Sequence, residues 1–363
     1  MPRGVSRRMT PALDFLACAR WNPVIGFKTP PWVFRNFSVI VGSPMRIDKR
    51  RIEYIRTCEG RDETVLGTVM PEVGQARQLT VPLTSNHEVV SPLRYPGGKS
   101  VLFGFIKVLI EKLEMSNPTY VEPYAGGAGV ALRLLKEDCV SRIVINDYDQ
   151  DVFAFWNSAV NHSAKFLEKF DDVEPTLEEW RRQKKIIRDS SDEIERGFAF
   201  FFLNRTNRSG VINGGVIGGL NQAGKYKVWA RYNKEKLREK LVFLGGHAGS
   251  IEVTCHDGRR VAEEYASQLD TFVYLDPPYV EKGGSLYLNA FDIQQHQELA
   301  ETLKRFGNGT WMLTYDDTEL IRSLYKESPG GLFPLRYSAA SRRRTNELMI
   351  FSNALARSMG SLA

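Results

Sequence analysis

The sequence predicts an α/β fold in which strands and helices alternate around a parallel sheet, with one helical insert. The alternation begins at Ser91. Helically periodic segments lie at 101–113, 129–136 and 150–160, and apolar strands lie at 119–121 and 142–146. Residues 161–245 interrupt it. It then resumes with strands at 251–255, 272–275, 311–315 and 348–351. Strands joined through helices imply a parallel sheet with right-handed crossovers.

Residues 1–90 differ from the rest of the chain. Prolines punctuate them, helical periodicity is poor, and they hold 13 Lys and Arg against 8 Asp and Glu. We interpret them as a partly disordered extension with a short helix at Met45–Cys58. The catalytic part is then predicted to comprise 91–160 and 246–363, with 161–245 as an inserted module.

Composition excludes several classes of protein. The chain is 42% hydrophobic and 25% charged, which is unlike a disordered chain, a collagen or a disulfide scaffold. It has no run of about 18 apolar residues, so we expect no membrane span. Its four cysteines form no C-x-x-C pair, which favours a reducing cytoplasm over a secretory route.

Positive charge is concentrated in the predicted insert. Residues 201–240 hold nine Lys and Arg but only two acidic side chains. Such an excess indicates a surface that contacts a polyanion. For Lys234–Lys240 alone, a solvated helix face explains the charge equally well.

A glycine turn follows the strand at 119–121. It has the sequence Glu122-Pro-Tyr-Ala-Gly126-Gly127-Ala-Gly129 and leads into a helix. Glycines let a ligand lie against bare backbone. Asp147 ends the next strand, 21 residues after Gly126, where an acidic residue accepts hydrogen bonds from ribose hydroxyls. The pair indicates an adenosine-type cofactor, although a plain tight turn would also explain the glycines.

The second motif is Asp276-Pro277-Pro278-Tyr279, directly after the apolar strand 272–275. The prolines fix the backbone and remove two N–H donors. The carboxylate and carbonyl oxygens therefore form a rigid acceptor group beside an aromatic ring. Such a group suits a planar amino group, whereas the alternative is a strand-ending turn with a helix-capping aspartate.

The third motif is Arg94-Tyr95-Pro-Gly-Gly-Lys99, just before the first helix. Glycines followed by lysine can approach an anion at a helix start. The segment matches only part of a phosphate-binding loop, so a phosphate-loop nucleoside triphosphatase is a minor alternative.

Along the chain, the order of Arg94–Lys99, Glu122–Gly129, Asn146-Asp147 and Asp276–Tyr279 resembles the Dam-like DNA adenine-N6 methyltransferases of the alpha group. The similarity spans about Ser91 to Asn353 and includes Asn204-Arg-Thr-Asn-Arg-Ser-Gly210. It implies a Rossmann-like S-adenosylmethionine-dependent methyltransferase sheet with an inserted, mainly helical target-recognition module. Tyr124 departs mildly from the phenylalanine that is more usual after Glu-Pro.

The resemblance also implies roles for individual residues. Asp276, Pro277, Pro278 and Tyr279 would form the catalytic site. The residues that would bind S-adenosylmethionine are Tyr95, Lys99, Glu122, Gly126, Gly127, Asp147, Asp257 and Asp276. Asp147 would hold the ribose and Asp257 would contact the cofactor's adenine. Cys255-His-Asp257 lacks a matching ligand set, so we predict no metal site.

The predicted reaction transfers a methyl group to adenine N6 in double-stranded DNA. Hydrogen bonds to Asp276 and to the Pro277 carbonyl would orient the amino group and raise its electron density. The base would be flipped out of the duplex and stacked on Tyr279. The predicted DNA contacts of the insert are Arg205, Arg208, Lys225, Lys227 and Arg231, and a second basic run, Arg342–Arg344, is either a phosphate clamp or a solvated loop.

Alternatives remain open at this point. N4-cytosine methylation uses the same kind of amino acceptor, although Ser-Pro-Pro-Tyr is commoner there. RNA or a protein glutamine is a remoter acceptor. A nicotinamide-dependent oxidoreductase would use the glycine turn and Asp147, but leaves Asp276 unexplained, and a silent DNA-binding module has no sequence support. We expect a cytoplasmic monomer, with a restriction endonuclease as a candidate partner and no membrane association.

Overall fold

The computed structural model describes residues 70–81, 83, 88–95, 98–280, 291–336 and 344–360. All of them belong to one unit, Tyr54–Ala363. The predicted helix at Met45–Cys58 and the basic residues Arg342 and Arg343 lie outside these ranges. In the described part of the chain, no helix has the length and apolarity needed to cross a lipid bilayer.

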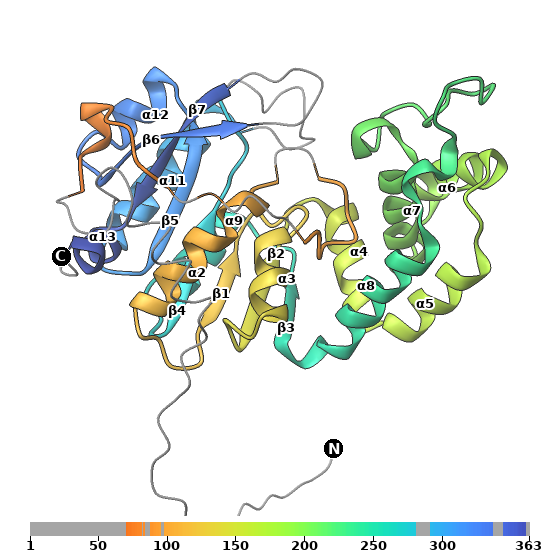
Figure 1. Ribbon diagram of the computed structural model, residues 1–363, viewed down its shortest axis with the longest axis horizontal. Helices are drawn as coiled ribbons and strands as arrows, with labels where there is room; N and C mark the ends of the chain where they lie inside the picture. Colours follow the sequence, from red (N-terminus) through yellow and green to blue (C-terminus); the bar gives the residue numbers. More distant parts are fainter. Residues whose placement is uncertain are drawn as a thin grey trace, which may run out of the picture. The chain divides into compact units, whose positions relative to one another are not determined.

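Within the described ranges, seven strands form one mixed sheet in the order β3-β2-β1-β4-β5-β7-β6 (Figure 1). Their bounds are β1 Thr119–Glu122, β2 Arg142–Asn146, β3 Ile251–Thr254, β4 Thr271–Leu275, β5 Trp311–Asp316, β6 Gly330–Arg336 and β7 Arg344–Phe351. Strands β3, β2, β1, β4 and β5 pair in parallel, as predicted. The Rossmann-like α/β prediction is confirmed.

The last two strands correct the prediction of a wholly parallel sheet. β7 pairs antiparallel with both β5 and β6. β6 was not predicted at all, because its sequence begins with Gly330-Gly331 and contains Pro334, residues that are depleted in strands. Only pairing with a neighbouring strand makes this segment extended.

Helices cover both faces of the sheet. Because successive strand residues point to opposite faces, Tyr120 and Ile143 join one core while Val121 and Val144 join the other. The first core includes α2 Phe103–Lys112, α3 Gly129–Lys136, α4 Gln150–Asn161 and α13 Asn353–Gly360. The second includes α9 Gly258–Tyr265, α11 Ile293–Arg305 and α12 Glu319–Leu324. The result is a helix–sheet–helix arrangement.

Four further helices gather beside α4, next to the β3 edge of the sheet (Figure 1). They are α5 Ser163–Asp172, α6 Leu177–Asp189, α7 Glu193–Thr206 and α8 Lys234–Gly246. The phenylalanine run of α7 is buried and packs against Phe155 of α4 and Phe166 of α5, with Phe155 and Phe201 stacked at 5.7 Å between ring centroids. These helices therefore continue the core of the sheet rather than forming a separate one.

Part of the predicted extension is built into the sheet domain. Val73 is fully buried, and Leu79 N–H donates to the Leu332 carbonyl of β6 at 2.6 Å. Gly330 N–H donates in turn to the Pro71 carbonyl at 2.7 Å. Residues 71–79 thus run beside the edge strand β6, so the packed part of the chain begins before Ser91.

Asn146 joins the ends of three parallel strands. Its side chain is fully buried, and its Nδ2 donates to the carbonyls of Pro123 at 2.8 Å and His256 at 2.9 Å. Its Oδ1 accepts from Thr254 Oγ1 and from His256 N–H, each at 2.8 Å. One amide therefore fixes the segments that follow β1 and β3 against the end of β2.

Replacing Asn146 by alanine should leave these partners unsatisfied in the protein interior. We expect Asn146→Ala to lower the free energy of unfolding by about 2–4 kcal/mol, measured by urea denaturation. Asn161→Ala on the exposed end of α4 is the control, with little expected change. Equal stability of the two variants would show that the amide does not hold these strand ends.

Candidate active site at the carboxyl edge of the sheet

The predicted motifs meet where the strand order reverses. β1 and β4 are neighbours in the sheet, and the chain runs outward from β1 to β2 and β3 on one side and from β4 to β5 on the other. Ligands of open α/β sheets bind outside the carboxyl ends of strands at such a switch point. Glu122 ends β1 and Asp276 directly follows β4, so both lie at this switch point.

Asp276 accepts three hydrogen bonds from described side chains. Its Oδ2 accepts from Lys99 Nζ at 3.0 Å. Its Oδ1 accepts from Tyr279 Oη at 3.1 Å and from Thr314 Oγ1 at 2.8 Å. The Thr314 hydroxyl in turn bonds with the Tyr274 hydroxyl at 2.9 Å, which orients it towards Asp276. The carboxylate is thus fixed in place, while 21% of its side chain stays exposed.

Lys99 is a buried cation held by two carboxylates. Its side chain is 5% exposed and lies 3.0 Å from Asp276 Oδ2 and 3.7 Å from Glu347 Oε2. Burial by itself would lower the pKa of Lys99, but the charges of Asp276 and Glu347 outweigh burial and raise this pKa. The ammonium also lies 5.0 Å from the centroid of the Tyr279 ring. Lys99 therefore faces the acidic motif at 276–279.

Sequence analysis missed Thr314 and Glu347. Glu347 is 1% exposed, and its Oε2 accepts from Tyr279 Oη at 2.8 Å. The predicted last strand began at Leu348, one residue after it. An acidic residue directly before a buried apolar strand was the available signal. Thr314 gave none, because threonine is common in strands.

The two prolines lie between these polar groups. Pro277 is buried and Pro278 is half-buried, and neither offers an N–H. Tyr279 is 6% exposed, with its ring 5.9 Å from that of Tyr315. The segment is therefore pinned at both ends, by the Asp276 carboxylate and by the Tyr279 hydroxyl.

The glycine turn packs against Tyr95. Gly126 has a φ of +47°, and a Cβ on it would lie 2.5 Å from Tyr95 Cε1. A Cβ on Gly127 would lie 2.8 Å from Tyr95 Cβ. Any larger side chain at either position would displace the Tyr95 ring. Gly126 is thus required by its backbone conformation and by this close approach, and Gly127 by the close approach alone.

Asp147 lies beside the same turn. Its Oδ2 accepts from Gly126 N–H at 2.9 Å and its Oδ1 from Asp149 N–H at 3.0 Å. Burial raises the pKa of Asp147 to about 7, although the two N–H bonds act in the opposite direction. The side chain remains half-buried, so its oxygens keep lone pairs for a further donor.

Glu122 is more deeply buried than Asp147. It is 5% exposed, and its Oε1 accepts from Ala131 N–H of α3 at 3.2 Å. Burial raises the pKa of Glu122 to about 8, and the charge of Asp276 adds to this effect. Near neutral pH the carboxyl group is therefore largely protonated.

Asp257 caps helix α9. Its Oδ1 accepts from Arg259 N–H at 2.8 Å, and Arg259 Nη2 lies 2.6 Å from its Oδ2. The Arg259 side chain lowers the pKa of Asp257, which is 42% exposed. The adjoining Gly258 is needed because a Cβ would lie 2.4 Å from the ring of Tyr124, whose buried hydroxyl has no partner among the described residues.

The predicted DNA-contacting residues separate into two groups. Arg205 is half-buried, and its guanidinium donates to the backbone carbonyls of Arg231 and Pro92. Burial lowers the pKa of Arg205 to about 10, and nearby Arg94 and Arg231 add to this effect. Lys227 donates to the Gln222 carbonyl. These two side chains therefore stabilise the loop 207–233, which connects α7 and α8.

The other three cations are exposed. They are Arg208, Lys225 and Arg231. Tyr226 lies between the last two, 5.8 Å from the Lys225 ammonium and 5.8 Å from the Arg231 guanidinium. Tyr226 is 57% exposed and Trp229 is 58% exposed. The loop thus presents cations interleaved with aromatic rings, which suits contacts with phosphates and bases.

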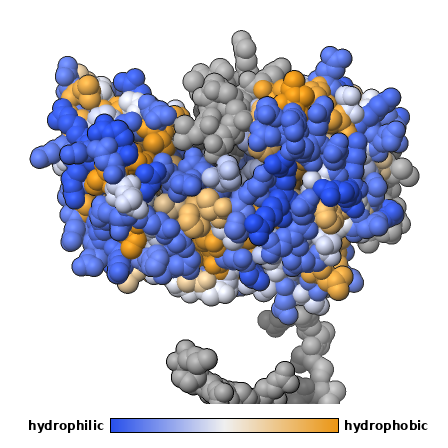
Figure 2. Space-filling model, turned by 180° about the vertical axis from the view of Figure 1, so that it is seen from behind, coloured by the Kyte–Doolittle hydropathy of each residue, from blue (hydrophilic) through white to orange (hydrophobic). Residues whose placement is uncertain are grey.

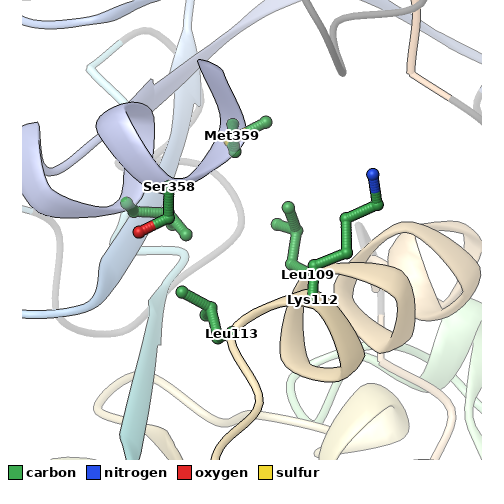
Figure 3. Close-up of a pocket in the computed structure, with 6 residues that line it drawn as sticks. Leu109, Lys112, Leu113, Ser358 and Met359 are labelled. Carbon is green, nitrogen blue, oxygen red and sulfur yellow. The ribbon is translucent and has the colours of Figure 1, made fainter. Parts of the chain in front are cut away.

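Other features of the described residues lie away from this edge. Figure 2, viewed from behind Figure 1, shows a mostly hydrophilic face with scattered apolar patches. A small pocket between α2 and α13 is lined by Leu109, Lys112, Leu113, Leu355, Ser358 and Met359 (Figure 3). It contains no residue of the predicted site. The described residues hold no cluster of His, Cys, Asp or Glu that fits a metal ion.

Comparison with known proteins adds independent evidence. A family model for D12 class N6 adenine-specific DNA methyltransferases matches residues 95–341. Type II methyltransferase M.MjaIII of Methanocaldococcus jannaschii is 26% identical over 209 residues, which cover 53% of this chain and 70% of that protein. A DNA adenine methylase of Vibrio cholerae serotype O1 is 27% identical over 254 residues, covering 64% and 84%.

A solved structure, the rRNA methyltransferase aviRa from Streptomyces viridochromogenes, is 15% identical and covers 76% of this chain and 91% of its own, with a TM-score of 0.30. A likeness this weak supports no argument.

The family match, in contrast, confirms the resemblance and favours N6-adenine chemistry over N4-cytosine methylation or nicotinamide-dependent oxidation. A methyltransferase of this kind implies a methyl donor of the S-adenosylmethionine type and a DNA substrate. The chain belongs to the D12 class N6 adenine-specific DNA methyltransferase family.

Proposed function

We propose that Asp276 is the acceptor that orients and activates the adenine amino group during methyl transfer. One observation carries this proposal: a carboxylate fixed by Lys99, Tyr279 and Thr314 remains 21% exposed at the sheet's switch point. A carboxylate offers about four lone-pair sites. From the described side chains, Oδ1 accepts two bonds and Oδ2 one, which leaves Oδ2 the capacity for an N–H donor.

Adenine's exocyclic nitrogen is a weak nucleophile because its lone pair is delocalised into the ring. An N–H bond to Asp276 Oδ2, with a second to the Pro277 carbonyl, would raise electron density on nitrogen and fix its direction. Both effects act through orientation and electrostatics. A base inside a duplex cannot reach this buried group, so we propose that the adenine is flipped out and packs against Tyr279.

The residues around the glycine turn fit an adenosine-containing methyl donor. Asp147 has half-buried oxygens that can accept from ribose hydroxyls, and Asp257 can accept from an adenine amino group. The unpartnered hydroxyl of Tyr124 lies next to Gly258 at the same edge. When bound, S-adenosylmethionine supplies an electrophilic methyl group on a sulfonium. We propose that Glu122, Gly126, Gly127 and Tyr95 line its methionine part.

In this proposal, Lys99 acts by orienting Asp276. The sequence resemblance gave Lys99 a place beside the cofactor. Its ammonium lies against two carboxylates, one of them Asp276, which is itself predicted to face the cofactor. Pairing with Asp276 and Glu347 holds the Asp276 carboxylate in its orientation next to the cofactor, so Lys99 contributes to that site through Asp276.

We propose that the segment 161–245 recognises DNA through its exposed cations Arg208, Lys225 and Arg231. Arg205 and Lys227, also predicted as DNA contacts, donate to backbone carbonyls of the loop 207–233, and their contact with DNA stays a prediction. A cytoplasmic location, a monomeric state and a companion restriction endonuclease stay predictions from the sequence.

Removing the Asp276 carboxylate should abolish catalysis and preserve the fold. We expect Asp276→Ala and Asp276→Asn to lower methyl transfer by at least about a thousandfold, since alanine has no acceptor for the amino proton and asparagine replaces the charged acceptor by a neutral amide oxygen. Liquid chromatography of digested DNA would quantify N6-methyladenine. Asp172→Asn at the exposed end of α5 is the matched control. Near-normal N6-methyladenine from folded Asp276→Ala would refute the assignment.

Cofactor affinity should depend on the ionisation of Asp147, whose pKa is about 7. Ribose hydroxyls donate to the ionised carboxylate, so affinity should rise about tenfold from pH 6 to pH 8. Calorimetric titration with S-adenosylmethionine measures this. Asp147→Asn should bind more weakly and lose most of the pH dependence, with Glu122 carrying the remainder because its pKa is about 8. A flat profile in the unsubstituted protein would contradict the ribose assignment.

Exposed cations that contact phosphates should control the salt dependence of DNA binding. We expect Lys225→Ala and Arg231→Ala each to weaken binding several-fold and to reduce the slope of log K against log salt by about 1. Fluorescence anisotropy with a duplex of mixed sequence measures both quantities. Lys165→Ala, which removes an exposed cation of α5, should change neither. If all three variants bind alike, the loop is not the DNA-binding surface.

A further inference from the structure

Glu347 belongs to the site geometrically but has no part in the chemistry described so far. It lies on β7, opposite Asp316 of β5, and is 1% exposed. The family match ends at residue 341, before this position. A buried carboxylate is costly unless its partners stabilise it, so its partners indicate its role.

The first partner is Tyr279. Its hydroxyl lies 2.8 Å from Glu347 Oε2 and 3.1 Å from Asp276 Oδ1. A phenol has one hydrogen to donate, and the shorter distance favours Glu347 as the acceptor. Glu347 thereby fixes the tyrosine ring and competes with Asp276 for the one hydroxyl proton.

The second partner is Lys99. Its ammonium lies 3.0 Å from Asp276 Oδ2 and 3.7 Å from Glu347 Oε2. Attraction to Glu347 opposes a closer approach of the cation to Asp276. Both contacts act in the same direction, because each leaves more electron density on the Asp276 oxygens.

We propose that Glu347 is a positioning residue for methyl transfer. It holds the Tyr279 hydroxyl and shares the Lys99 ammonium, so that Asp276 remains a strong acceptor for the amino group of the target adenine. This inference rests on the proposed function of Asp276. Glu347 itself would contact neither the cofactor nor the base.

The test is steady-state kinetics of the full chain with S-adenosylmethionine and duplex DNA. Glu347→Gln keeps the size and an acceptor oxygen but removes the charge. We expect kcat to fall about tenfold or more while both KM values stay within about twofold, because substrate contacts are unchanged. Glu347→Asp retains the charge and should recover part of kcat. Glu301→Gln, on the exposed face of α11, is the control and should behave as the unsubstituted protein.

A double-mutant cycle tests the route through Tyr279. In a Tyr279→Phe background, Glu347→Gln should cost less in kcat than it does alone, since one of its partners is already removed. Fully additive effects would overturn that route. A kcat of Glu347→Gln within twofold of the unsubstituted protein would overturn the whole inference.

The remaining outcomes separate this inference from the proposed function. If the unsubstituted protein forms no N6-methyladenine, the proposed function fails. If the unsubstituted protein is active and Glu347→Gln has the same kcat, the inference alone fails. Should Glu347→Gln not fold, as judged by circular dichroism, Glu347→Asp decides: a fall in kcat at constant KM supports positioning, and an unchanged kcat contradicts it.

Discussion

The burial of the Lys99 ammonium between two carboxylates is the constraint on which this site depends. A cation taken out of water must be compensated by fixed countercharges. Asp276 and Glu347 provide them from β4 and β7, whereas Lys99 comes from the segment before α2. These ion pairs bring three distant parts of the chain together. Moving any of them would leave a charge uncompensated in the interior.

The parallel sheet supplies the second constraint. Strands β3, β2, β1, β4 and β5 all end at one edge, so polar residues that follow these buried strands gather there. Asn146 then fixes the connecting segments by bonding to Pro123 and His256. The carboxyl groups of Glu122 and Asp147 occupy this edge with raised pKa values because burial removes them from water.

The helical segment after α4 is connected to the site through one short stretch. The Asn204 side chain accepts from the backbone N–H of Arg94 at 2.7 Å and donates to its carbonyl at 2.9 Å. The next residue, Tyr95, packs on the glycine turn, and Lys99 follows shortly after. α7 and the glycine turn are therefore linked by a few residues of backbone, a short path between the segment that follows α7 and the acidic motif.

The sequence by itself determined the five parallel strands, the family and the motifs at the sheet edge, because buried strands and rigid Gly and Pro segments are encoded locally. It did not reveal β6, whose Gly and Pro lack strand preference, nor the packing of Val73 against the domain. Only the tertiary structure showed that Lys99 faces Asp276, that Arg205 binds backbone carbonyls, and that Glu347 and Thr314 belong to the site. Those facts depend on which distant side chains meet after folding, and pairing of buried charges leaves no periodic signature along a chain.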